Sequence, residues 1–228
     1  MSKYRNEQNP LVKQSLGLPL NKKIYNKNIY PCNLGIFFSS KISPSILEKL
    51  KFQIEFVFDS FFFDITFIGE KKLTSCIQNS DAKEEFNFLD RSLTKVVLYP
   101  TNVFYSTIKN QMPENNLAIG LGLTNLPIYS SSDERLLFLF GEANLKHNCA
   151  IVSTHNLKEL HKSETAENRI IKEGIHETGH LILGLEHCMN DSCVMWFSAN
   201  VKEIDRKSNK LCEKCRLELE EIRIINNF

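Results

Sequence analysis

The chain lacks several features that would assign it to a specialised class of protein. Its 28 basic and 27 acidic residues give a net charge of +1. Without a basic excess to attract a polyanion, nucleic acid is not an expected partner. Residues 1–23 lack the short apolar core of a secretory signal. The most apolar segment, 54–68, is interrupted by Asp59, Ser60 and Asp64, short of the ~18 uninterrupted apolar residues of a membrane span. We therefore expect a soluble, cytoplasmic protein with no membrane partner.

We also find no internal repeat and no low-complexity tract. The 228 residues suffice for one sizeable hydrophobic core, and 42% apolar and 24% charged residues are ordinary for a globular protein. Residues 1–30, rich in Lys, Asn, Gln and Pro, are predicted to form a flexible arm. Residues 31–228 are predicted to form a single monomeric domain, with an N-terminal subdomain at 31–184 and a small C-terminal subdomain at 185–228.

The first part of the domain predicts a β–α–β unit. The apolar run that follows Asn33 indicates a buried strand. Ser43 and Pro44 are typical of the N-cap and the first position of a helix. The alternating residues 63–69 predict a second strand. A strand, a helix and a strand in this order favour a parallel pair.

The rest of the chain adds further strands and helices. Residues 80–112 are ambiguous, and we interpret them as two helical stretches that meet at Pro100. Strands are predicted at residues 117–124, 136–143 and 149–155, of which the last two are close enough to pair with each other. A long helix is predicted from Ser163, its N-cap, to Gly184, where it stops. A short amphipathic helix is predicted to begin near Cys212.

The long helix carries two histidines within the sequence His-Glu-Thr-Gly-His at residues 176–180. Because residues four apart share a helix face, His176 and His180 can bind one zinc ion. Glu177 lies beside that ion, where it can take a proton from a metal-activated water and pass it to a leaving amine. The pattern predicts zinc-dependent hydrolysis of peptide bonds with Glu177 as general base. The alternative is a surface helix with two unrelated histidines.

Two downstream residues extend this pattern. Gly184 is predicted to end the helix, and His187 follows three residues later, where the returning chain can offer a third nitrogen. Met195 follows at a distance that suits a turn beneath the metal, although methionine is more often a filler of the core. We therefore predict that His176, His180 and His187 are the ligands of a catalytic zinc.

The cysteines predict a second metal site. There are seven, and clustered cysteines in a reducing compartment are more often metal ligands than disulfides. Cys188 and Cys193 are followed, after eighteen residues, by Cys212 and Cys215. Two such pairs suit a tetrahedral zinc held by four thiolates, a closed and therefore structural site. The alternative is four reduced core cysteines, and core positions are also expected for Cys32, Cys76 and Cys149.

The combined His and Cys pattern resembles the archaemetzincins, a metzincin-like family of zinc metallopeptidases. The resemblance rests on residues 176–180, 184–188, 193–195 and 212–215, with weaker likeness at 139–143 and 150–153, and covers about residues 115–220. It implies a zincin-like α/β (α+β) fold with a mixed twisted sheet, an active-site helix and two zinc ions per chain. It also implies that an antiparallel edge strand, at 136–141, lines the cleft and pairs with an extended peptide. In the resemblance, Met195 is the Met-turn residue.

The chain departs from the family pattern at one point. The family places two residues between the second His and the Gly, and this chain has three, at 181–183. One extra residue turns a helix by about 100°, which leaves Glu186 as an alternative third ligand. We favour His187 because the Gly-x-x-His-Cys register is intact. A π-bulge or a longer last turn can absorb the insertion.

Two further functions compete with the expected one, which is an aminopeptidase or short-peptide endopeptidase acting on peptides or proteins. The first is a zinc-binding interaction module with little or no catalysis. The second is a four-cysteine nucleic-acid module, based on the basic residues between the cysteine pairs, namely Lys202, Arg206, Lys207 and Lys210. Glu203 and Asp205 lie among them, so a solvated face of mixed charge explains this segment better. Arg169, on the outer face of the long helix, can brace a neighbouring loop.

Overall fold

The structure is a computed structural model. It describes residues 30–39, 41–69, 73, 82–86, 95–158, 163–184 and 186–228. Except for Tyr30, the predicted N-terminal arm lies outside these residues, as does Cys76.

A five-stranded sheet forms the centre of the molecule, in the order β2-β1-β5-β8-β7. The strands are β1 (Cys32–Phe38), β2 (Phe62–Gly69), β5 (Ile119–Thr124), β7 (Gly141–Asn144) and β8 (Cys149–Ser153). β1 pairs in parallel with β2 and β5, and β5 pairs in parallel with β8. β7 is antiparallel to β8 and forms one edge. The predicted mixed sheet, parallel pair and antiparallel edge are confirmed.

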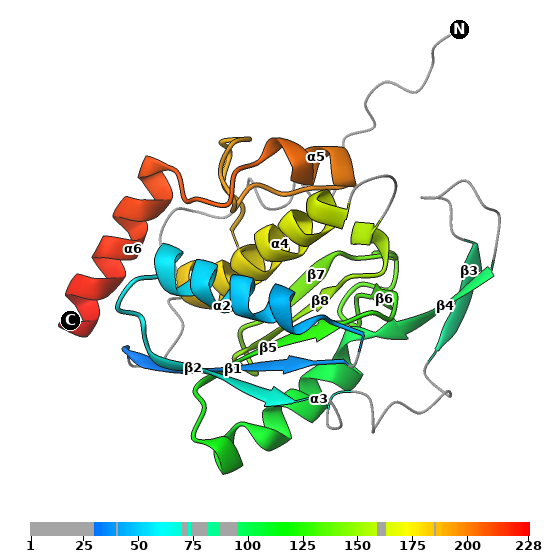
Figure 1. Ribbon diagram of the computed structural model, residues 1–228, viewed down its shortest axis with the longest axis horizontal. Helices are drawn as coiled ribbons and strands as arrows, with labels where there is room; N and C mark the ends of the chain where they lie inside the picture. Colours follow the sequence, from blue (N-terminus) through cyan, green and yellow to red (C-terminus); the bar gives the residue numbers. More distant parts are fainter. Residues whose placement is uncertain are drawn as a thin grey trace, which may run out of the picture.

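Helices cover both faces of this sheet (Figure 1). On one face lie α2 (Pro44–Val57), α4 (Ser163–Leu183) and α6 (Glu213–Asn226), which share a core with β1, β5 and β8. On the other face α3 (Thr101–Gln111) packs against β5 and β8. Short 3₁₀ turns, η2 (Pro113–Asn115) and η3 (Asn156–Lys158), follow α3 and β8. α4 is therefore held between the sheet, α2 and the C-terminal elements.

The helix boundaries follow local capping chemistry. The Ser43 side chain accepts a hydrogen bond from the amide of Ile46, as predicted for an N-cap, and Pro44 takes the first helical position. Ser163, the predicted N-cap, is already the first residue of α4, so the helix begins one position earlier than predicted. Gly184 follows the last residue of α4 with a φ of +97°, a conformation that glycine adopts at little cost. The predicted stop is thus confirmed.

The prediction of two helices over residues 80–112 is wrong in its first half. A second sheet, β3-β4-β6, contains β3 (Lys83–Phe86), β4 (Lys95–Pro100) and β6 (Ile128–Tyr129). The sequence Val-Val-Leu-Tyr within β4 favours an extended chain. Pro100 ends this strand and caps α3, so only the helix after it was predicted correctly.

The predicted strand at 136–143 is also too long, because β7 begins at Gly141. Phe138 has a φ of +55°, in the left-handed region, which interrupts an extended strand. Leu139 instead makes an isolated antiparallel bridge with Ile128 of the second sheet. The edge of the main sheet beside α4 is therefore only residues 141–144.

The C-terminal segment contains one helix that the sequence did not predict, α5 (Val201–Arg206), in addition to the expected α6. Asn200 caps α5 by accepting from the amide of Glu203. Arg169 of α4 donates from Nε and Nη2 to the carboxylate of Asp205, both at 2.7 Å. Arg169 thus anchors the C-terminal segment on α4, but the prediction of an outer-face position beside a loop is wrong, because its side chain is buried against the helix α5.

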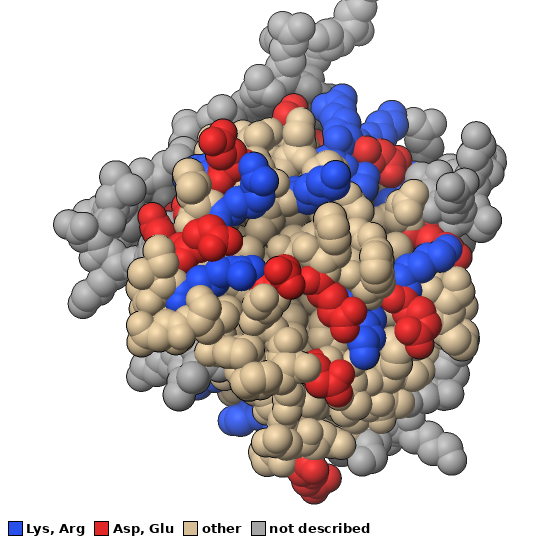
Figure 2. Space-filling view, turned by 60° about the vertical axis from the view of Figure 1, so that its left-hand side comes forward, with Lys and Arg blue, Asp and Glu red and all other residues tan. Residues whose placement is uncertain are grey.

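Acidic and basic side chains are interspersed on the face that Figure 2 shows. That face carries mixed charge rather than a stripe of one sign. In the part of the chain that the structure describes, none of the helices has the length and apolar character needed to cross a bilayer.

Candidate metal centre and active site

α4 presents His176 and His180 on its face toward the C-terminal segment, and both side chains are buried. Their Nε2 atoms lie 3.0 Å apart. Each Nδ1 contacts a backbone carbonyl oxygen, that of Val194 for His176 at 2.7 Å and that of Gly184 for His180 at 2.9 Å. Because a carbonyl oxygen only accepts, both Nδ1 atoms carry the proton. The sequence-predicted pair is thus oriented from both sides.

These tautomers make the two facing Nε2 atoms a fit for a metal ion. Burial lowers the pKa of His176 well below its usual range and that of His180 to about 4, so both rings are neutral. Two neutral rings with protonated Nδ1 atoms turn two lone pairs toward each other, which repel unless a cation lies between them. Metal-binding histidines commonly donate their other ring N–H to a carbonyl in this way.

His187 completes the group. Its ring centroid lies 5.3 Å from that of His176 and 4.7 Å from that of His180. Ligand atoms of the three histidines all lie within 4.8 Å of one another. Glu186, the alternative ligand, is exposed and is not part of this group. The geometry therefore favours three nitrogens as the donor set, a set that catalytic zinc accepts while one position stays open.

The extra residue before Gly184 is absorbed by a longer last turn of α4. The amide of Gly184 donates to the carbonyl oxygen of His180 at 3.0 Å, the regular α-helical spacing. No π-helical residue occurs in the described part of α4. The chain then returns so that His187, not Glu186, faces the other two imidazoles.

Glu177 is buried beside this group. Its Oε2 has no hydrogen-bond partner among the described residues. Burial, together with the nearby carboxylates of Glu173 and Glu142, raises the pKa of Glu177 well above its usual range. A Cβ placed on Gly141 would lie 2.5 Å from Oε1 of Glu177. Glycine at the start of β7 therefore lets the edge strand pass directly over this carboxyl group.

Met195 lies under the same stretch of α4. A Cβ placed on Gly179 would lie 2.3 Å from Met195 Sδ, so the thioether packs against the backbone of the helix between the two histidines. The carbonyl oxygens of Val194 and Met195 accept from His176 Nδ1 and from the amide of Cys188. The predicted turn beneath the histidines is present, and it orients one of them.

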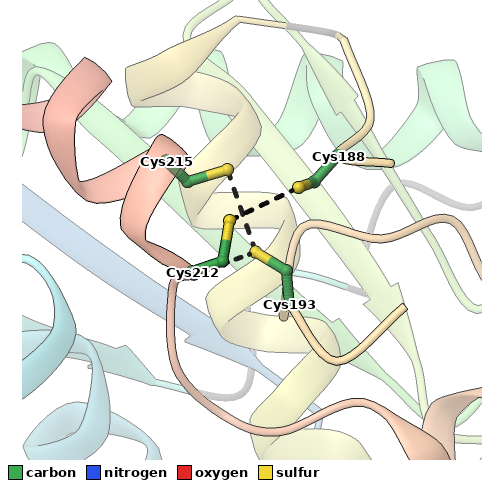
Figure 3. A group of neighbouring side chains, drawn as sticks. All are labelled: Cys188, Cys193, Cys212 and Cys215. Atoms are coloured by element: carbon green, nitrogen blue, oxygen red, sulfur yellow. Dashed lines mark hydrogen bonds between the residues drawn. The ribbon is translucent and has the colours of Figure 1, made fainter. Parts of the chain in front are cut away.

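The four clustered cysteines converge, as Figure 3 shows. Cys188 and Cys193 lie in the loop that follows α4, and Cys212 and Cys215 lie at the start of α6. The Sγ–Sγ distance is 3.6 Å for Cys188 with Cys212 and 3.8 Å for Cys193 with Cys215. Zn–S bonds of 2.3 Å at tetrahedral angles place sulfurs roughly 3.8 Å apart. All four are free thiols at the spacing that a zinc ion needs.

Among the sulfurs of the cluster, Cys193 has a lowered pKa, whereas burial raises the pKa of Cys188 and the contact with Cys193 raises that of Cys215. Contact with Cys215 and the amide of Cys212 lower the pKa of Cys193, to about 5. The amide of Asn190 donates to Cys188 Sγ at 3.4 Å. Outside the cluster, burial raises the pKa of Cys32 and Cys149 to about 12, and both belong to the core as predicted.

The edge strand β7 is fixed on the side away from α4 by Glu142. Its carboxylate accepts from the hydroxyl of Tyr105 at 2.7 Å and from the hydroxyls of Thr101 and Ser130. These donors belong to α3 and to the loop after β6. Glu142 therefore ties the strand that covers Glu177 to the opposite layer of the fold.

Residues 42–221 match the sequence profile of peptidase family M54. The chain belongs to family M54, the archaemetzincins. The archaemetzincin of Pyrococcus abyssi is 30% identical over 185 residues, which cover 79% of this chain and 90% of that protein. With the Archaeoglobus fulgidus archaemetzincin the identity is 40% over 99 residues, 43% of this chain and 58% of that protein. The chain thus spans little more than half the length of that relative.

Two solved structures share this architecture. The Methanopyrus kandleri archaemetzincin superimposes with a TM-score of 0.63 at 23% identity, covering 84% of this chain and 94% of that one. A zinc-dependent peptidase from Methanocorpusculum labreanum has a TM-score of 0.60 at 25% identity, covering 82% and 99%. The zincin-like mixed α/β fold implied by the resemblance is confirmed.

Some residues at this M54 site were not predicted from the sequence. Gly141 and Gly179 have their roles only because Glu177 and Met195 approach them in the folded chain. Lys207 was interpreted as part of a solvated, mixed-charge loop, and this is wrong, because its side chain is fully buried against Glu173 of α4. A glycine that faces a buried motif can be sought in the sequence as a sign of close packing. The residues around Lys207, by contrast, do not indicate its contact with Glu173.

Proposed function

We propose that this M54 protein hydrolyses peptide bonds with the help of zinc held by His176, His180 and His187, and that Glu177 is the general base. The observation that carries the proposal is the convergence of three imidazoles beside a buried carboxyl group that lacks a partner among the described residues. Bound zinc would supply a Lewis acid that polarises the scissile carbonyl and lowers the pKa of a water molecule.

Each protein group then has a defined task. Glu177 Oε2 takes the proton from the attacking water and later gives it to the leaving amine nitrogen, so one carboxyl group serves both halves of the reaction. Val194 and Gly184, through their carbonyl oxygens, keep the lone pairs of His176 and His180 directed at the centre of the group. Met195 supports the helix from below, in the role of a Met-turn.

The proposal includes a second zinc ion, held by Cys188, Cys193, Cys212 and Cys215. Sulfur spacings of 3.6 and 3.8 Å support it. This ion would have a structural role, because four thiolates leave no open position. The substrate is a peptide or protein whose extended backbone pairs with β7, an antiparallel edge strand that passes over Glu177.

The test uses the purified full-length protein and a library of short peptides, with free and blocked N-termini to separate aminopeptidase from endopeptidase activity. We expect two zinc ions per chain and cleavage that stops when the more accessible ion is removed by a chelator and returns when zinc is added back. Absence of zinc-dependent cleavage while the histidine site is filled would contradict the proposal and favour a zinc-binding interaction module.

The choice of third ligand gives a separate prediction. His187→Gln should weaken zinc binding at the histidine site strongly, because one of the three ligand nitrogens is lost, and should reduce peptide hydrolysis to the same extent. Glu186→Gln, one residue away and exposed, is the matched control and should change neither. Zinc titration of both variants measures the difference. Loss of the ion in Glu186→Gln with retention in His187→Gln would reverse the assignment.

A further inference from the structure

Lys207 is an unusual residue for its position, because its side chain is fully buried within the C-terminal segment. Lysine is almost never fully buried unless it is paired. Its Nζ lies 2.7 Å from Oε1 of Glu173, whose side chain is 5% exposed. This contact is an ion pair without hydrogen-bond geometry, and the ammonium group donates a hydrogen bond to the carbonyl oxygen of Trp196 at 3.4 Å. The pair therefore links the end of α5 to two other parts of the molecule.

Those two parts are the active-site helix and the turn that contains Met195. Glu173 precedes His176 by three residues on α4, so it lies on the same side of the helix. Trp196 directly follows Met195. Lys207 thus reaches the turn and the helix at the same time, close to the place where the turn contacts His176.

The carbonyl oxygens of Val194, Met195 and Trp196 in this turn each accept a hydrogen bond from a residue outside the turn. The oxygen of Val194 accepts from His176 Nδ1, and that of Met195 accepts from the amide of Cys188. The oxygen of Trp196 accepts from Lys207. The first contact orients a predicted ligand of the histidine site, the second reaches a predicted ligand of the sulfur site, and the third connects both to a buried ion pair.

We propose that Lys207 and Glu173 form a buried clasp that holds the 194–196 turn against α4 and thereby orients His176. Both are positioning residues, since they act through Val194 and the turn rather than by touching a substrate. This inference deepens the proposed function and rests on it for the metal at the histidine site.

The charge of the clasp also bears on the site. The ammonium group of Lys207 is paired with Glu173, one helical turn before His176 on α4. A positive charge this close opposes the entry of a divalent cation unless it is neutralised, and Glu173 supplies the neutralising charge. Removing Glu173 alone should therefore weaken metal binding more than removing Lys207 alone.

The test compares Lys207→Met, Glu173→Gln and the double variant Lys207→Met/Glu173→Met in the full-length protein. Each single variant leaves one unpaired buried group, so either can reduce stability. The double variant removes both charges, and replacement of a buried ion pair by apolar side chains often preserves the fold. The double variant therefore tests whether the pair orients His176 in a protein that still folds.

The matched control is Arg169→Gln/Asp205→Asn. This pair joins α4 to α5 one turn earlier on α4, through hydrogen bonds of 2.7 Å between Arg169 and Asp205. We expect it to lower the midpoint of thermal unfolding without changing the histidine site.

Two readouts report on the histidine site itself. The first is the zinc dissociation constant of the site that a chelator empties first, which we expect to rise 10- to 100-fold in the double variant, as for other residues that orient a ligand. The second, on the metal-free protein, is the tautomer of His176 by nitrogen NMR, which we expect to lose its exclusive Nδ1–H form. A folded double variant with unchanged dissociation constant and unchanged tautomer would overturn the clasp. If the unsubstituted protein binds no ion that depends on the histidines, the proposed function fails first and the clasp with it.

Discussion

Replacement of Glu177 by Gln is expected to leave both metal sites filled and to lower the rate of peptide hydrolysis by about 10²- to 10⁴-fold, the usual contribution of general acid–base catalysis. The amide has nearly the shape of the carboxylate, so the buried space under Gly141 stays occupied. The amide cannot take a proton from water, however. The variant therefore lacks the base that Glu177 Oε2, which has no hydrogen-bond partner among the described residues, would provide. Turnover of the best library peptide and zinc content per chain are the measurements.

A control for this variant lies on the same helix. Glu167 forms an exposed ion pair with Lys49 at 2.7 Å, far along α4 from the histidines, and exposed pairs of this kind contribute little to stability. Glu167→Gln should therefore retain the activity of the unsubstituted protein. Retained hydrolysis in Glu177→Gln would contradict the assigned base, whereas joint loss of zinc and activity would mean that Glu177 supports the metal instead.

The second large effect is expected from Cys212→Ser. Structural zinc contributes on the order of 10 kcal/mol to the folding of small metal-bound units, which is comparable to the whole stability of a domain. Loss of the ion should release the segment after Gly184, because the ion would link Cys212 and Cys215 to Cys188 and Cys193, whose sulfurs lie 3.6 and 3.8 Å from theirs. We expect one zinc ion less per chain, rapid proteolysis within residues 186–228 and a lower unfolding temperature.

Cys149→Ala is the comparison for this variant. Cys149 is fully buried in β8 and lies outside the sulfur cluster. Its replacement should cost the few kcal/mol typical of a small change in the core, with the zinc content unchanged. A Cys212→Ser protein that keeps its full zinc content, or that loses one ion without becoming sensitive to protease, would show that the cluster is not a structural zinc site.

The parts of the site that could be predicted from the sequence are those that depend on short spacings. His176 and His180 are four residues apart in one helix, and a helix places them together whatever surrounds it. The four cysteines could likewise be predicted as a metal site, because each pair is separated by only a few residues in the sequence. His187 was predicted because Gly184 ends the helix and lets the chain return, and the positive φ of that glycine agrees with this reading.

The parts that were missed depend on contacts between distant residues. The strands β3 and β4 are short and were interpreted as helix, since single-strand patterns of four to six residues are ambiguous. The positive φ of Phe138, which delays the start of β7, has no signal in the sequence around it. Lys207 resembles its charged neighbours along the chain, and only the position of Glu173 in the folded protein distinguishes it.

One peptide bond joins His187 to Cys188, and so joins the two proposed metal centres. Only a few backbone dihedrals separate the exposed imidazole from a sulfur of the cluster. An ion bound by the four sulfurs would therefore limit how far that imidazole can move from the rings of His176 and His180. A filled sulfur centre would therefore keep the third nitrogen within reach of a metal ion that the other two imidazoles would hold.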